Sequence, residues 1–99
     1  MKYFRSLANT LKTEWPAKYP VSVRTYKYLP YHGDCDLLRK GRRKYFRIRI
    51  ERHDESVMVH FLLHEWAHAL SWEHHQDADH PNAWGKQFAK IYRWWEDTL

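Results

Sequence analysis

The stretch VMVHFLLHEWAHALSW, residues 57–72, decides how this chain folds. Its apolar and histidine side chains recur every three or four residues, at Val57, Phe61, His64 and His68. Residues at that spacing lie on one face of an α-helix, and further apolar residues widen the buried surface, namely Leu63, Ala67 and Leu70. Ser56 directly precedes the run and is a favourable N-cap. We therefore expect a half-buried helix from Ser56 onward.

The chain on either side of this stretch predicts two more helices. Residues 80–95 carry apolar side chains at helical spacing, at Trp84, Phe88, Ile91 and Trp95. Pro81 suits the first turn of that helix, because no hydrogen-bonded amide is lost there. Residues 3–14 show the same kind of spacing, which Pro16 ends, at Phe4, Leu7, Leu11 and Trp15.

Two strands are predicted between the first and second helices. Residues 21–29 are rich in Val, Thr and Tyr, as strands are. Residues 45–51 alternate apolar and charged side chains, which indicates a half-buried strand whose charged positions suit a sheet edge. Residues 31–41 look like a loop, and residues 40–44, KGRRK, predict a basic turn. These elements predict one α+β domain over residues 1–99, a small antiparallel sheet against the first and second helices, with the third helix closing the site described below.

Composition narrows the class of protein. A chain of 99 residues forms one domain, and 17 Lys and Arg against 12 Asp and Glu leave a net charge of +5, which allows an acidic partner such as DNA. The single cysteine, Cys35, excludes an internal disulfide and a cysteine-based zinc ribbon, and it suits a reducing compartment. No apolar run approaches the roughly 20 residues that span a bilayer. We expect a cytoplasmic monomer without a membrane partner.

The central helix carries the motif HExxH, as His64-Glu65-Trp66-Ala67-His68. Histidines four residues apart lie on the same helical face, so both imidazoles can reach one tetrahedral Zn²⁺ ion. The intervening Glu65 then faces the water-bearing position and can act as general base in the hydrolysis of a peptide bond. The alternative for His64 and His68 is two half-buried histidines satisfied by ordinary hydrogen bonds.

Several residues compete to be the third metal ligand. His74 has the spacing of the metzincin motif, but Ser71 stands where that motif has a glycine and no methionine follows. His80 begins the third helix, where a chain folding back over the HExxH helix would bring it to the metal. Carboxylates in the intervening polar stretch are further candidates, at Glu73, Asp77 and Asp79.

Residues 45–95 resemble the SprT-like zinc metallopeptidase family, which includes short phage-encoded proteins and the protease core of Spartan. The resemblance rests on HEWAHAL and on the stretch from His80-Pro81 through Trp84-Gly85 to Tyr92-Arg93. In that family a third histidine follows HExxH in a pattern such as His-Gly-x-x-aromatic. The resemblance therefore implies a zinc endopeptidase with His80 as the third ligand, acting on protein or peptide substrates, DNA-associated ones among them. Pro81 replaces the usual glycine.

Other roles follow less directly from the residues. We expect one of four side chains to stabilise the oxyanion formed during hydrolysis, namely Tyr28, His32, Tyr92 or Arg93. Residues 45–51, as a sheet edge, would pair with an extended peptide. The basic residues 40–44, with Arg47 and Arg49, would contact phosphates. The alternative function is a non-catalytic module in which zinc stabilises the fold and the basic surface binds nucleic acid or a host protein.

Overall fold

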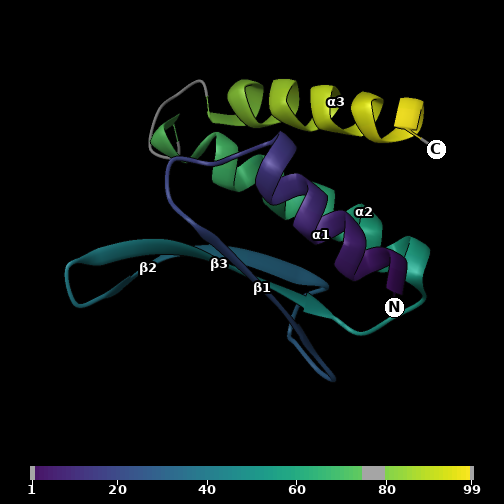
Figure 1. Ribbon diagram of the computed structural model, residues 1–99, viewed down its shortest axis with the longest axis horizontal. Coiled ribbons are helices and arrows are strands. Elements are labelled where there is room, and N and C mark those ends of the chain that lie inside the picture. The colour runs from purple at the N-terminus through teal and green to yellow at the C-terminus, as the bar shows by residue number, and fades with distance from the viewer. Residues whose placement is uncertain (1, 75–79, 99) are drawn as a thin grey trace.

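The computed structural model describes residues 2–74 and 80–98. The elements in these residues are α1 (Lys2–Glu14), β1 (Val21–Tyr26), β2 (Gly33–Lys40), β3 (Arg43–Glu51), α2 (Glu55–Leu70), a short 3-10 helix (Trp72–His74) and α3 (His80–Thr98). The three α-helices lie on one side of the sheet, with α1 beside α2 and α3 beyond them (Figure 1). The predicted α+β class is confirmed.

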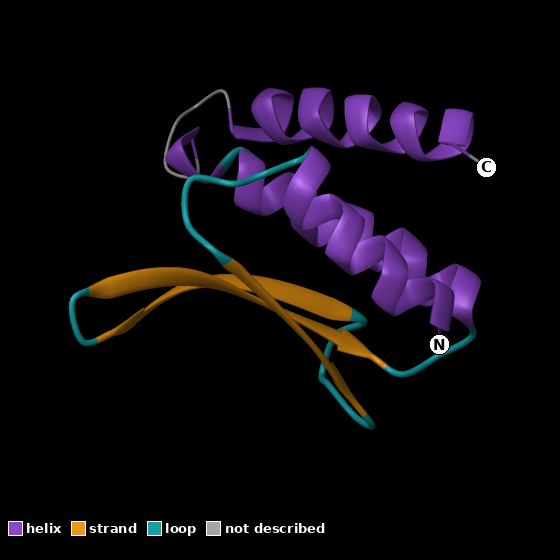
Figure 2. Cartoon of the chain, in the orientation of Figure 1, coloured by secondary structure: helices purple, strands orange, loops and turns teal. Residues whose placement is uncertain are grey.

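The sheet is mixed, so the prediction of an antiparallel sheet is wrong for one strand pair. The strand order is β1-β3-β2, with β1 parallel and β2 antiparallel to β3 (Figure 2). The strand predicted at the edge, β3, takes the centre because its inward residues Phe46, Ile48 and Ile50 are buried almost completely. Strands β1 and β2 occupy the edges of the sheet. The acidic residues of β2 are typical of an edge strand.

A strand occupies most of the predicted loop 31–41. Gly33–Lys40 pairs with β3 through a two-residue hairpin turn, Gly41 and Arg42. Gly41 has φ +64°, a conformation that glycine adopts without steric cost and that hairpin turns require at their first central residue. The sequence GDCDLLRK does not alternate apolar and polar residues as a typical half-buried strand does. It forms a strand because it pairs with β3.

Helix α2 is the centre of the core and contacts the sheet, α1 and α3. Its Trp66 is fully buried and donates a hydrogen bond from Nε1 to the Trp15 carbonyl oxygen at 2.8 Å. The helix begins one residue before the predicted N-cap Ser56, because the carbonyl of Asp54 already accepts the first helical hydrogen bond, from Met58 N, at 3.0 Å. None of the helices in the described residues is long and apolar enough to cross a membrane.

Candidate metal centre

Helix α2 brings His64, Glu65 and His68 together as its spacing predicts. The two imidazole centroids lie 5.0 Å apart, and one potential ligand atom from each of the three residues lies within 4.8 Å of the others. The His64 side chain is 30% exposed and that of Glu65 only 7%. Two reachable histidines beside a buried carboxylate are a donor set that suits Zn²⁺.

Glu65 orients the His64 ring. Oε2 of Glu65 lies 2.9 Å from Nδ1 of His64, a hydrogen-bond distance. When Nδ1 carries the proton and donates it to Glu65, Nε2 keeps its lone pair for a metal ion. The pair thus prepares His64 as an imidazole ligand.

Strand β2 passes directly against Glu65 at Gly33. A Cβ atom at position 33 would lie 3.4 Å from Cγ of Glu65, 3.0 Å from Cδ1 of Ile50 and 3.1 Å from the Arg49 carbonyl oxygen. A side chain there would displace β3 or Glu65. The sequence did not single out Gly33, because its role depends on the pairing of β2 with β3.

Cys35 lies on the same inward face of β2 as Gly33, opposite buried Ile48. Burial, and to a smaller extent the negative charge of Glu65, raises the pKa of the Cys35 thiol far above its ordinary value. The thiol therefore stays protonated at neutral pH, which fits a structural cysteine.

Trp84 of α3 covers the two histidines. Its ring stacks on His68, with centroids 5.3 Å apart and an interplanar angle of 25°, and its centroid lies 4.8 Å from that of His64. Nε1 of Trp84 donates a hydrogen bond to the His64 carbonyl oxygen at 3.2 Å. The apolar spacing of α3 identified Trp84 as a packing residue, and the structure adds that it shields one side of the histidine pair from water.

The aromatic contacts also set the register between α2 and α3. Trp84 contacts both His64 and His68, Phe88 contacts His60 and His64, and Tyr92 contacts His60. The two helices are therefore antiparallel, and each step of four residues along α3 matches a step of four back along α2. The same register places the backbone of residue 80 beside the C-terminal end of α2, close to His68.

The other predicted third ligands are placed as follows. Glu73 pairs with Lys18, whose Nζ lies 2.7 Å from Oε1 of Glu73. Asp77 and Asp79, and the side chains of His74 and His80, lie outside the described residues. Ser71 ends α2 with φ −102° and its hydroxyl donates to the Ala67 carbonyl oxygen, so the left-handed turn favoured by a metzincin glycine is not formed at this position.

The four residues predicted to stabilise the oxyanion lie in different parts of the structure. Tyr28 is 80% exposed in the β1–β2 connection, and Tyr92 packs between Phe88 and Trp95 on α3. Arg93 lines a shallow surface hollow with other α3 residues. His32 stacks on Phe61, with ring centroids 4.9 Å apart, and Phe61 in turn lies 6.1 Å from His64. His32 and Tyr92 are thus each linked to His64 through one intervening ring, Phe61 and Phe88 respectively.

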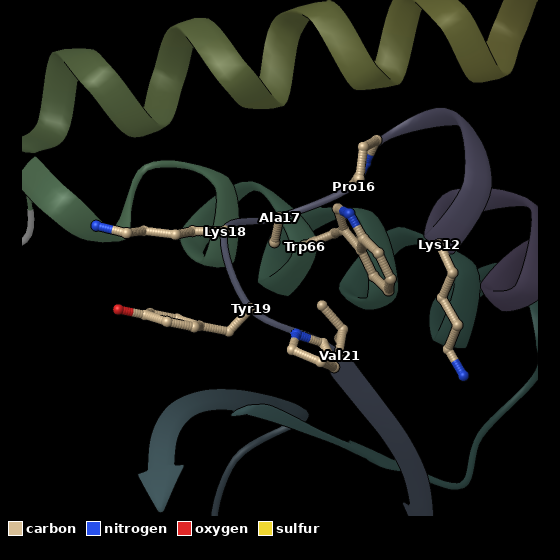
Figure 3. Close-up of a pocket in the computed structure, with 8 residues that line it drawn as sticks. Lys12, Pro16, Ala17, Lys18, Tyr19, Val21 and Trp66 are labelled. Carbon is tan, nitrogen blue, oxygen red and sulfur yellow. The ribbon is translucent and has the colours of Figure 1, made fainter. Parts of the chain in front are cut away.

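A surface hollow of about 480 Å³ lies elsewhere, between α1 and β1 (Figure 3). The connection from Pro16 to Val21 lines it together with Lys12 and Trp66. His64, Glu65 and His68 take no part in this lining. The hollow thus contributes no wall to the metal centre.

No family model, curated protein or solved structure matches this chain. The function is therefore inferred from the residues and their geometry.

Proposed function

We propose that this chain is a zinc-dependent metalloendopeptidase of the SprT-like kind, with His64 and His68 as zinc ligands and Glu65 as general base. The observation that carries the proposal is the group of donor atoms that α2 assembles, two half-buried imidazoles around a nearly buried carboxylate.

Each residue of the group has a defined task. A bound zinc ion would supply a Lewis acid that polarises a carbonyl group and lowers the pKa of water to about 7. Glu65 would accept the proton of the attacking water and pass it to the leaving amine. Trp84 would exclude bulk water from one side, which strengthens electrostatic interactions inside the site.

His80 is the proposed third ligand. The antiparallel register of α2 and α3 supports it, because position 80 lies one helical turn before Trp84 on the same face of α3. A tetrahedral site with three histidines keeps a fourth position open, as catalytic zinc sites require.

Strand β2 is the proposed docking edge for an extended protein or peptide substrate. It is an edge strand and its Gly33 lies against Glu65. A peptide that pairs with β2 by main-chain hydrogen bonds would run past the general base. This role was assigned from sequence to residues 45–51, which form the central strand instead.

Hydrolysis of an unfolded protein, such as reduced and alkylated casein, tests the proposal. Zinc-loaded protein is expected to cleave it, and Glu65→Gln is expected to lower the rate by about 10²- to 10⁴-fold while zinc stays bound. Glu96→Gln, at an exposed position of α3, is the matched control and should cleave like the unchanged protein. Equal cleavage by the Glu65→Gln variant would overturn the assignment.

The uncovered face of the sheet favours a second candidate function, nucleic-acid binding. All helices of the described residues lie on the other face (Figure 2). A hollow of about 470 Å³ is lined by strand residues whose positions alternate with those of the buried Val23, Phe46 and Ile48, namely Ser22, Arg24, Tyr26, Lys40, Tyr45 and Arg47. Cations and aromatic rings on an open surface suit single-stranded nucleic acid. Arg47 and Arg49 are paired with Asp36 and Asp34, so the phosphate contacts would fall on Arg24, Lys40 and the hairpin turn.

Fluorescence anisotropy with a labelled single-stranded oligonucleotide tests this second function. Arg24→Ala/Lys40→Ala should weaken binding and flatten its salt dependence by about 0.7 per lost phosphate contact. Lys86→Ala/Lys90→Ala removes the same charge from α3 and should bind like the unchanged protein. Equal weakening by both double variants would show a non-specific charge effect and contradict a site on the sheet.

A further inference from the structure

A second group of metal-ligand side chains lies at the end of the sheet, outside the HExxH motif. One potential ligand atom from each of His32, Glu51 and His53 lies within 4.8 Å of the others. The three residues come from the β1–β2 connection, the last position of β3 and the connection that follows β3. Two imidazoles and one carboxylate form the donor set of several zinc and iron sites.

The backbone holds these three residues in place. Glu51 N donates to the His32 carbonyl oxygen at 2.9 Å, and Arg52 N donates to the Tyr26 carbonyl oxygen at 2.8 Å. The first bond fixes His32 opposite Glu51, and the second fixes the chain between Glu51 and His53. These two hydrogen bonds hold the main chain of the three residues in register.

The side chains are oriented as ligands are. Oε2 of Glu51 accepts a hydrogen bond from Leu29 N at 2.9 Å, a contact that leaves Oε1 on the side of His32. Stacking on Phe61 sets the plane of the His32 ring. Such supporting contacts are typical of the residues that surround metal ligands.

The distance between two of the donor atoms fits a shared ion better than a direct bond. Nδ1 of His32 lies 3.6 Å from Oε1 of Glu51, too far for a good hydrogen bond. Ligands of a tetrahedral zinc ion lie roughly 3.3 Å apart, given bonds of about 2.0–2.1 Å. The His53 ring, with its centroid 5.7 Å from that of His32, stands close enough to supply the third donor after a side-chain rotation.

We propose that His32, Glu51 and His53 form a second binding site for a divalent transition-metal ion, with Zn²⁺ as the probe. The ion ties the β1–β2 connection to the end of β3, beside Phe61, the ring that separates this site from His64. Solvent reaches the site, since the His32 side chain is 55% exposed, so the second ion exchanges more readily than one held at the HExxH motif.

The test is zinc titration of the full chain with the first site removed. His64→Ala/His68→Ala protein is expected to bind one zinc ion, and adding His53→Ala to that variant is expected to abolish the binding. Adding His60→Ala instead is the matched control, because His60 is an exposed histidine of α2 outside both groups, and it should leave the ion bound. Retention of the ion after His53→Ala, or its loss after His60→Ala, would overturn the proposal.

A second measurement tests the same site if the His64→Ala/His68→Ala variant does not fold. In the otherwise unchanged protein, His53→Ala should lower zinc uptake by one ion per chain, with circular dichroism unaltered. Zinc should also slow chymotrypsin cleavage after exposed Tyr28 and Tyr31 in the unchanged protein but not in His53→Ala. Equal uptake by the two proteins would contradict the site.

Discussion

The two groups of His and Glu side chains contain the same donors but are assembled in opposite ways. His64, Glu65 and His68 lie within one helix, and helical geometry alone brings them together. Glu51 and His53 are two residues apart, and His32 joins them only because β2 pairs with β3 in one register. A site within one helix can therefore be predicted from the sequence, whereas a site made by strand pairing cannot.

Burial separates the two groups further. The Glu65 side chain is 7% exposed and lies beside Gly33, whereas the Glu51 side chain is 19% exposed and the neighbouring His32 is 55% exposed. A carboxylate shielded from water interacts more strongly with charge that develops during a reaction. The helical group therefore suits catalysis, and the group at the sheet end suits an exchangeable ion.

The largest expected effect is on peptide hydrolysis, which should require the HExxH group but not the group at the sheet end. Loss of the general base should lower the rate of unfolded casein hydrolysis by about 10²- to 10⁴-fold. His68→Ala should lower this rate by at least as much, because it removes the metal site itself. His53→Ala should leave the initial rate close to that of the unchanged protein. Initial rates at saturating zinc measure both, and an equal loss in the two variants would remove the functional distinction between the groups.

The next effect is on stability. A zinc ion that binds only the folded chain should raise the free energy of unfolding by about 2.7 kcal/mol at a free concentration one hundred times the dissociation constant. Urea unfolding with and without zinc measures this gain in the His32→Ala/His53→Ala protein, from which the second proposed site is removed. The gain should fall strongly in His68→Ala, and an undiminished gain there would mean that zinc stabilises the fold from elsewhere.

A smaller effect tests the packing of β2 against Glu65. Gly33 follows His32 and packs against Glu65, so Gly33→Ala should destabilise the fold by about 1–3 kcal/mol through overpacking. Gly85→Ala is the matched control, since a Cβ there meets no atom within 4 Å and a helical alanine should stabilise by about 0.4–1 kcal/mol. Thermal unfolding distinguishes them, and a neutral Gly33→Ala would contradict the close approach of β2 to α2.

The smallest effect concerns Cys35 behind Glu65. Removal of the Glu65 charge by Glu65→Gln should lower the thiol pKa slightly and speed its reaction with an aromatic disulfide by less than about tenfold, because burial is the larger cause of the raised pKa. Unfolding in urea should accelerate the reaction far more. A thiol that reacts as fast in the folded protein as in urea would contradict its burial.

The sequence predicted the helices well because their signals are local. The 3.6-residue spacing in α1, α2 and α3 appears in the order of the residues themselves, and it also places His64 beside His68. The alternation in β3 likewise identified its buried face, Phe46, Ile48 and Ile50.

The sequence failed where pairing between distant segments decides the structure. Asp34 and Asp36 have low strand propensity, yet they lie in β2, where they pair with Arg49 and Arg47. Local patterns carry no information on strand order, so β3 was placed at the edge and β1 was taken as antiparallel. Glu65 packing against Gly33, and the group of His32, Glu51 and His53, depend on that strand order and could not be found beforehand.

The proposed metal centre is tested by measuring zinc content with elemental mass spectrometry after dialysis against a weak chelator. The chain should carry His32→Ala/His53→Ala, so that only the HExxH group can hold an ion. One zinc ion per chain is expected, and it should be lost on further change of His64 or His68 to alanine. Absence of zinc after reconstitution, or zinc retained without His64 and His68, would contradict the proposed metal centre.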